Sequence, residues 1–282
     1  MTYRTARHDT TLSSVDIRSL GYRTDLTIRV LEGSQVEDRG DYLVIRTPEN
    51  PTFWWGNFLL LSTPPLPGQA GEWLGRFDAE FPGASHIALG VDVTEADAVD
   101  RQELIASGLR LTRLAVLTAS DVRVPPLPNT KATYRKLSGD GDWEQAAELR
   151  AVVSEGEPGS EPGFLQARLA AERAITEAGY GSWFGAFIDG RLLAQLGLIT
   201  GTTGLARYQN VETHPAARRQ GLAGSLVCHA GRHALAADGA STLVMVADPA
   251  EVAIRVYRSV GFAEAQAQIG FERPSPPDVA ES

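Results

Sequence analysis

Hydrophobic positions in the second half of the chain follow two periods, one typical of strands and one typical of helices. The Asp189-Gly190 pair predicts a tight hairpin turn between two strands, because both residues accept positive φ. Adding a final strand, the predicted order is βααβββαβαβ, an α/β class fold with a mixed (α+β) sheet flanked by helices. The expected strands span 131–138, 182–188, 192–200, 206–213 and 243–246. Two helices are expected at 143–153 and 164–178, a third begins at Leu222, and a fourth runs from Ala253 and stops at Gly261.

The first half of the chain repeats part of this order. Without gaps, Gly68, Ala70 and Gly71 align with Gly221, Ala223 and Gly224 at an offset of 153 residues. Shared glycines and a shared order of elements favour a repeat, and therefore two tandem domains. In this half we expect strands at 57–61, 87–93 and 111–117 and helices at 71–81 and 97–107.

A proline-rich segment separates the two halves. The stretch from Val124 to Asn129 contains three prolines, which cannot continue a helix or a central strand. We therefore expect a first domain at 1–123, a linker at 124–130, a second domain at 131–273 and a disordered, Pro-rich tail at 274–282.

The pattern around residues 211–224 predicts a phosphate-binding turn. A strand ends at His214-Pro215, a basic turn follows, and a helix opens with an apolar stripe that includes Leu226. The N-terminus of a helix presents unpaired N–H groups and the positive end of the helix dipole. Gly221 and Ala223 leave a pyrophosphate room to approach those groups, and two arginines, Arg218 and Arg219, add positive charge.

Two motifs resemble those of the GNAT superfamily of N-acetyltransferases. Arg218-x-x-Gly221-x-Ala223 is similar to the Arg/Gln-x-x-Gly-x-Gly/Ala signature of that superfamily. Val256-Tyr257, followed by Gly261-Phe262, is similar to its later Leu-Tyr-x-x-x-Gly-Phe segment. The resemblance covers residues 131–272 and implies direct attack of an amine on the thioester of acetyl-CoA.

The resemblance also implies roles for individual residues. Val211 and Thr213 would offer main-chain groups to the pantetheine arm of the coenzyme, and Tyr257 would donate a proton to the departing thiolate. Arg218 would assist the grip on the pyrophosphate. The backbone N–H groups that would make that grip belong to Arg219, Gln220, Gly221, Leu222, Ala223 and Gly224.

The general base is indicated less directly. Glu212 lies between the two strand positions expected to contact the coenzyme, with its side chain on the opposite face, and is the first candidate. Tyr208 and Asp248 are alternatives, and ordered water is a further route for the proton.

The first half lacks the chemical groups of this site. At the offset of 153 residues, Pro65 stands where the second half has Arg218, and Leu104 stands where it has Tyr257. Without the cation and the hydroxyl, we expect the first half to bind coenzyme poorly and to be a degenerate, non-catalytic GNAT-like domain.

Composition and sequence pattern argue against three kinds of partner, namely nucleic acid, membrane and metal. The net charge of −9 argues against nucleic acid, whose binding needs clustered Lys and Arg. No segment is long and apolar enough to span a bilayer, and no secretory signal or disulfide pair is apparent, so we expect a cytoplasmic protein without membrane contact. His229 and His233 have metal-ligand spacing but no evident third ligand, so we expect no metal.

Together these observations predict an acetyl-CoA-dependent N-acetyltransferase that acts on a primary amine of a small molecule or peptide. The resemblance implies that the acidic loop at 154–163 borders the acceptor site, and its composition suits either a solvated loop or recognition of a cationic amine. An acyl-CoA-binding regulatory or scaffolding protein is the alternative, and a dinucleotide-binding domain fits the glycine spacing poorly. A homodimer is left open.

Overall fold

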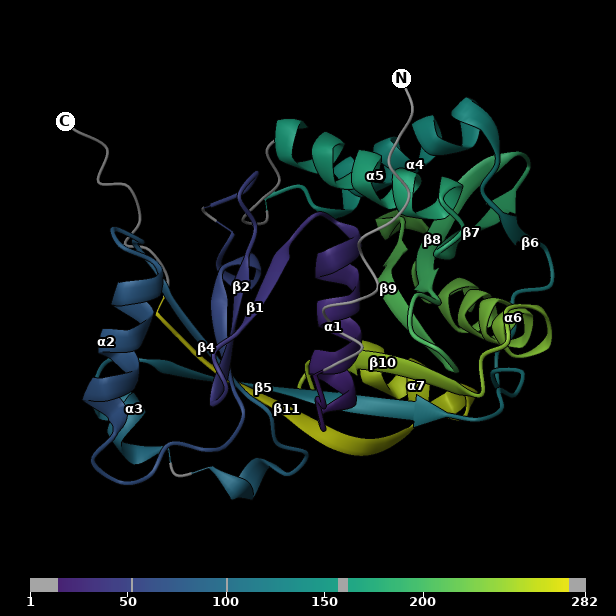
Figure 1. The fold of residues 1–282 in the computed structure, drawn as a ribbon. Coiled ribbons are helices and arrows are strands. Elements are labelled where there is room, and N and C mark those ends of the chain that lie inside the picture. The colour runs from purple at the N-terminus through teal and green to yellow at the C-terminus, as the bar shows by residue number, and fades with distance from the viewer. Residues whose placement is uncertain (1–14, 52, 100, 157–161, 274–282) are drawn as a thin grey trace. The chain divides into compact units, whose positions relative to one another are not determined.

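The computed structural model describes residues 15–51, 53–99, 101–156 and 162–273 (Figure 1). The chain divides into two units, residues 1–116 with 266–282, and residues 117–265. This division differs from the one expected at the proline-rich segment, because residues 124–130 lie inside the second unit and the last strand of the chain returns to the first. The tail expected at 274–282 lies outside the described residues.

The first unit contains one sheet with the strand order β1-β2-β3-β4-β11. The β3–β4 pair is parallel, and the other three pairs are antiparallel. Strand β5 begins in this unit and β11 ends in it. The elements are α1 (Leu20–Leu31), β1 (Gln35–Asp38), β2 (Tyr42–Arg46), η1 (Trp54–Gly56), β3 (Phe58–Leu61), α2 (Ala70–Glu80), β4 (Ile87–Val91), η2 (Ala96–Ala98), α3 (Gln102–Ala106), β5 (Arg110–Ala119) and β11 (Ala263–Arg273).

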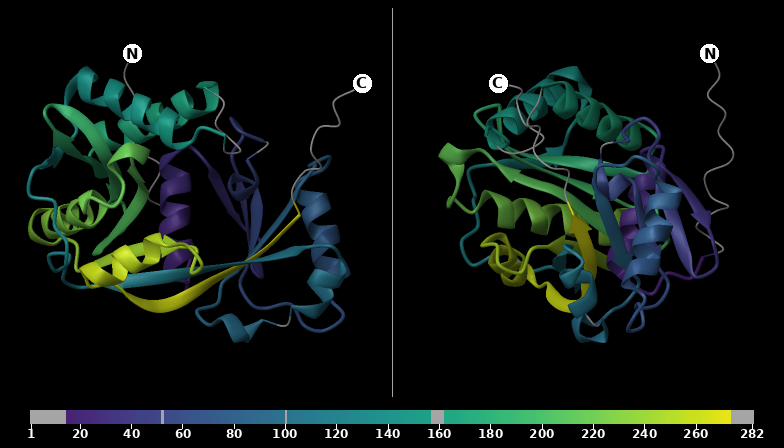
Figure 2. Two further views of the ribbon diagram at one scale, coloured as in Figure 1. Left: turned by 180° about the vertical axis from the view of Figure 1, so that it is seen from behind. Right: turned by 90° about the vertical axis from the view of Figure 1, so that its left-hand side faces the viewer.

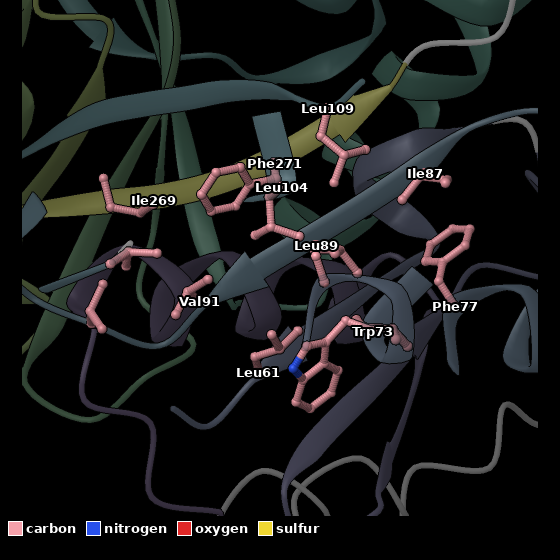
Figure 3. Close-up of a cluster of buried hydrophobic side chains, with 14 of the residues drawn as sticks. Leu61, Trp73, Phe77, Ile87, Leu89, Val91, Leu104, Leu109, Ile269 and Phe271 are labelled. Atoms are coloured by element: carbon pink, nitrogen blue, oxygen red, sulfur yellow. The ribbon is translucent and has the colours of Figure 1, made fainter. Parts of the chain in front are cut away.

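The core of the first unit explains why strands β3 and β4 are continuous apolar runs. Successive side chains of a strand point to opposite faces of the sheet. Phe58 and Leu60 of β3 therefore pack in a cluster with Tyr22 of α1. Leu59 and Leu61 belong to the cluster on the other face, where Figure 3 shows Trp73 and Phe77 of α2 beside the strand residues. Helices cover both faces, so no polar alternation remains.

One predicted helix of the first half is interrupted. The sequence pattern predicts a helix over 97–107, but the structure has the short turn η2 and a separate helix α3. Val99 lies between them with extended backbone (φ −116°, ψ 123°) and a buried side chain. Burial of the Val99 side chain in the core therefore favours an extended backbone at this residue, although the local sequence pattern favours a helix.

The second unit has the strand order β10-β9-β8-β7-β6. Figures 1 and 2 show α4 and α5 over one face of these strands and α6 over the other. The predicted order βααβββαβαβ is confirmed. Its elements are β6 (Thr133–Lys136), α4 (Gly139–Val153), α5 (Pro162–Glu177), β7 (Gly181–Ile188), β8 (Arg191–Ile199), β9 (Leu205–Thr213), η3 (Pro215–Ala217), α6 (Leu222–Ala237), β10 (Thr242–Ala247) and α7 (Ala253–Val260), followed by the start of β11.

Local sequence signals account for several boundaries in this unit. Asp189 and Gly190 have φ of 50° and 77°, which confirms the predicted hairpin turn between β7 and β8. Helix α7 ends at Gly261, whose φ of 117° suits a residue without a side chain. Across the described ranges, no helix combines the length and the apolar character needed to cross a membrane.

Candidate active site

Strands β9 and β10 are paired only over their first residues. Parallel pairing joins Leu205 to Thr242 and ends where Arg207 meets Val244. Strand β9 then continues for six residues, 208–213, and β10 continues to Ala247. In the part of the chain that the structure describes, these six residues have no strand partner on the β10 side. Their main-chain groups on that side are therefore available to a ligand.

A β-bulge lies at the place where β9 leaves β10. The register of β8 and β9 shifts between the pairs Gly197–Gln209 and Gln195–Glu212. One residue of β8, Leu196, therefore faces two residues of β9, and one of these two, Asn210, has φ of 47°. A bulge bends its strand and increases the local twist. This irregularity gives a physical cause for the separation of the two strands.

The turn between β9 and α6 holds a row of unpaired donors. Arg219 and Gly221 both have positive φ, 62° and 78°. The backbone N–H groups of residues 219–224 make no hydrogen bond within the described ranges, whereas the N–H of Ser225 donates to the carbonyl of Gly221 at 3.1 Å. Six consecutive donors at the N-terminus of a 16-residue helix form a site suited to an anion.

The proline-rich segment lies against this turn. The side-chain amide of Asn129 donates to the Gln220 carbonyl at 2.9 Å, and its backbone N–H donates to the Ser225 hydroxyl at 3.0 Å. The carbonyl oxygen of Leu127 lies too close to Gly221 to leave room for a Cβ there. The small residue at 221 is thus required by the packing of this segment as well as by the approach of a phosphate, a requirement that the sequence pattern did not reveal.

Two arginines flank the turn without a carboxylate partner. Arg218 and Arg219 are exposed, and neither forms an ion pair with any residue in the described part of the chain. The Arg218 Nε donates only weakly to the Thr213 carbonyl, at 3.4 Å. Their charges add to the positive end of α6 and remain free to neutralise a bound anion.

Tyr257 projects from α7 into the interior. It is 7 % exposed, and burial, together with the charge of Glu251, raises the pKa of its phenol to about 12. Its hydroxyl makes no hydrogen bond to any residue that the structure describes. By contrast, the hydroxyl of the other buried tyrosine of this unit, Tyr208, donates to the Val227 carbonyl at 2.8 Å. Tyr257 therefore differs from a core tyrosine with a satisfied hydroxyl.

The three candidate bases lie in different settings. The carboxylate of Glu212 accepts hydrogen bonds from Arg150 at 3.1 Å and from Gln195 at 2.5 Å, so both of its oxygens are engaged. Tyr208 points to α6, where its hydroxyl is buried. Asp248 closes a turn by accepting from the Ala250 N–H at 2.8 Å. Of the two carboxylates, only Glu212 lies on the separated part of β9.

The two histidines of α6 pack against other side chains. His229 lies 6.0 Å, between ring centroids, from both Tyr134 and Phe184. His233 contacts Phe184 and lies 3.5 Å from Asp238. Among the described residues there is no group of three or more His, Cys, Asp and Glu side chains that could hold a metal ion.

The corresponding turn of the first half differs in two ways. Strands β3 and β4 stay paired to the end of β3, where Leu61 meets Val91 and its carbonyl accepts from the Asp92 N–H at 2.8 Å. The N–H of Gly68, the counterpart of Gly221, is 2.7 Å from both carboxylate oxygens of Glu103. A side chain of the protein thus occupies the place of an anion. The sequence pattern did not single out Glu103, because the contact joins residues 35 positions apart.

Comparison with known proteins agrees with the geometry. The model of the acetyltransferase (GNAT) family matches residues 145–262. No curated protein matches the chain by sequence. Among solved structures, a GCN5-related N-acetyltransferase from Kribbella flavida is 16 % identical with a TM-score of 0.63, and the match covers 93 % of this chain and 98 % of that one.

Two further structures share the fold over most of their length. A functionally unknown conserved protein from Staphylococcus epidermidis is 13 % identical with a TM-score of 0.66, covering 96 % of this chain and all (100 %) of that chain. A tandem GNAT protein from the clavulanic acid biosynthesis pathway is 14 % identical with a TM-score of 0.51, covering 89 % and 88 %. At these identities the likeness concerns the fold. The part of the chain that matches the acetyltransferase (GNAT) family model, residues 145–262, is also the part that contains the separated strands and the turn before α6.

Proposed function

We propose that the second unit transfers an acetyl group from acetyl-CoA to a primary amine of a small molecule or peptide. The observation that carries this proposal is the unpaired end of β9 beside six unpaired N–H donors. The first suits the amide-bearing pantetheine arm, and the second suits the pyrophosphate. An acyl-coenzyme A carries both parts in one molecule.

In this proposal the coenzyme extends from the turn along β9. The N–H groups of Arg219, Gln220, Gly221, Leu222, Ala223 and Gly224 bind the pyrophosphate, and Arg218 neutralises its charge. Main-chain groups of Val211 and Thr213 pair with the pantetheine amides, as a further strand would. This fixes the thioester near Tyr257, so that attack by an amine becomes effectively unimolecular.

Two groups assist the reaction. The hydroxyl of Tyr257, which has no partner among the described residues, donates a hydrogen bond to the sulfur as the C–S bond breaks and the thiolate leaves. The ammonium proton of the acceptor leaves to Glu212, directly or through water. For this, the Glu212 carboxylate has to exchange a hydrogen bond from Arg150 or Gln195 for the new proton. Water is therefore the more accessible first acceptor.

The alternative is an acyl-CoA-binding regulatory protein, which would bind the coenzyme without turnover. Binding measurements do not separate the two, because both predict affinity. Release of free CoA thiol, measured over a panel of amines, does separate them. Thiol release that depends on both an amine and Tyr257 supports the enzyme, whereas acetyl-CoA bound without amine-dependent release supports the regulatory protein.

The first half is proposed to be a degenerate GNAT-like domain. Its strands do not separate, and Glu103 covers the N–H of the turn. Leu104, at the position of Tyr257, is buried and has no proton to donate. Each of the three requirements of the reaction is thus missing from that half.

Arg218→Ala should weaken binding of acetyl-CoA about ten- to a hundredfold. Loss of a charge-assisted hydrogen bond to phosphate costs about 1.5–3 kcal/mol, which corresponds to this range of affinity. Calorimetric titration measures it. The control is Pro65→Ala at the matching position of the first half, which should leave the affinity unchanged. A comparable loss in the control would mean that the coenzyme binds in the first half.

Glu103→Ala should leave the affinity for acetyl-CoA and kcat within about twofold of wild type, because the proposed site lies in the other half. The melting temperature should fall by a few degrees, since the charge-assisted hydrogen bond to Gly68 contributes about 1–2 kcal/mol. Titration of the variant should still give one coenzyme per chain. A second bound equivalent would show that the first turn is a coenzyme site that Glu103 covers.

A further inference from the structure

A buried group of charges lies behind the bulge of β9. Arg150 of α4, Glu172 of α5 and Glu212 of β9 have side chains that are 3 %, 4 % and 15 % exposed. The Arg150 guanidinium donates to Glu172 at 2.6 Å through Nη1 and to Glu212 at 3.1 Å through Nε. One cation therefore joins two helices to the strand of the proposed site.

The same group also holds the bulge residue. The second oxygen of Glu172 accepts from the side-chain amide of Asn210 at 2.7 Å. On the other side of Val211, Glu212 is held by Arg150 and by Gln195, whose amide also donates to the Ala146 carbonyl of α4 at 3.2 Å. Both neighbours of Val211 are thus fixed by hydrogen bonds to buried charged groups.

General stability is a poor explanation for this arrangement. Charged groups lose hydration on burial, and a buried ion pair is often no more stable than an apolar group of the same shape. The guanidinium Nη2 of Arg150 and the Oε1 of Gln195 are buried without a hydrogen-bond partner among the described residues, which adds to that cost. What the group does provide is a fixed geometry at residues 210–212, where β9 departs from regular pairing.

We infer that Arg150 and Glu172 are positioning residues for acetyl transfer. They hold the bulge at Asn210 so that Val211 and Thr213 present their main-chain groups to the pantetheine arm. They do so without contacting the coenzyme themselves. This inference rests on the proposed function. It also gives Glu212 a structural task besides its predicted role as a base.

Asn210→Gly tests the inference with little risk to the fold. Glycine keeps the positive φ of this position and removes the hydrogen bonds to Glu172 and Arg168. The matched control is Asp189→Gly, because Asp189 has nearly the same φ, 50°, in the β7–β8 turn. We expect the KM for acetyl-CoA to rise about tenfold in Asn210→Gly and to stay within about twofold in the control.

A second variant removes the buried charges together. Arg150→Met combined with Glu172→Leu and Glu212→Gln leaves no member of the group charged without its partner and should still fold. Its KM for acetyl-CoA should rise as in Asn210→Gly, while the KM for the amine changes less. If both variants fold and keep the wild-type KM for acetyl-CoA, the inference is wrong.

Hydrogen exchange of the free protein separates this inference from the proposed function. Amides of residues 208–213 should exchange faster in Asn210→Gly than in Asp189→Gly and wild type. Equal exchange in all three would overturn the claim that the charges hold β9. If wild type fails to bind acetyl-CoA, the proposed function and the catalytic part of the inference both fail, and the exchange rates still decide whether the charges hold the strand.

Discussion

Tyr257→Phe should lower kcat by about a hundredfold or more and leave the KM for acetyl-CoA nearly unchanged. The substitution removes one hydroxyl and keeps the ring that fills the interior. If the hydroxyl acts only on the leaving sulfur, its loss affects the transition state and not the bound substrate. Steady-state assays of thiol release measure both constants.

The matched control is Tyr208→Phe, the same change at the other buried tyrosine of the unit. The Tyr208 hydroxyl already donates to a helix carbonyl, so its loss should cost about 1 kcal/mol of stability and leave kcat unchanged. An equal fall of kcat in both variants would indicate a general effect of packing. It would remove the case for Tyr257 as the proton donor.

The pKa of Tyr257 also fixes the expected dependence on pH. Because burial raises the pKa to about 12, the phenol stays protonated, and able to donate, at every pH below that value. Full transfer to a thiolate of ordinary pKa, about 8.5, would be uphill by about 5 kcal/mol, so Tyr257 acts as a hydrogen-bond donor to the developing charge. An alkaline fall of kcat near pH 9 that disappears in Tyr257→Phe would contradict this assignment.

The second large effect is expected from Gly221→Ala, which should weaken acetyl-CoA binding by about a hundredfold or more. Gly221 has φ of 78°, a value that residues with a Cβ rarely adopt. A Cβ there would also overlap the Leu127 carbonyl, so the turn has to move. Movement of the turn misaligns several N–H donors at once, and two lost hydrogen bonds to a charged group account for about this change. Calorimetric titration measures it.

Gly239→Ala separates backbone strain from the loss of the site. Gly239 has φ of 72°, but a Cβ there meets no atom within 4 Å. Both variants should lose stability through the unfavourable φ. Only Gly221→Ala should lose affinity for the coenzyme, and similar affinities in the two variants would show that the turn does not bind the pyrophosphate.

Periodicity was sufficient for the order of elements in the second unit, because each helix there has one buried face and most turns carry a glycine. Prediction from periodicity failed where contacts between distant residues determine the local backbone structure. Val99 is extended because its side chain enters the core of the first unit. Contacts such as those of Leu127 with Gly221 and Glu103 with Gly68 join residues far apart in sequence.

The candidate site was predicted only in part for the same reason. Arg218, Gly221 and Tyr257 belong to local motifs, and sequence alone singles them out. The group around Arg150 joins α4, α5 and β9, and each residue by itself resembles an ordinary charged residue of a helix or strand. The bulge at Asn210 contains no glycine or proline from which it could have been predicted.

The return of β11 to the first unit limits how this chain can be divided or recombined. Ile269 and Phe271 of β11 pair with β4 and fill the core behind it, although they lie at the opposite end of the sequence. A fragment that ends before β11 would leave β4 with an open edge, which invites aggregation. The two halves therefore cannot be exchanged as independent segments of sequence. A domain exchange between relatives has to transfer β11 together with the first half.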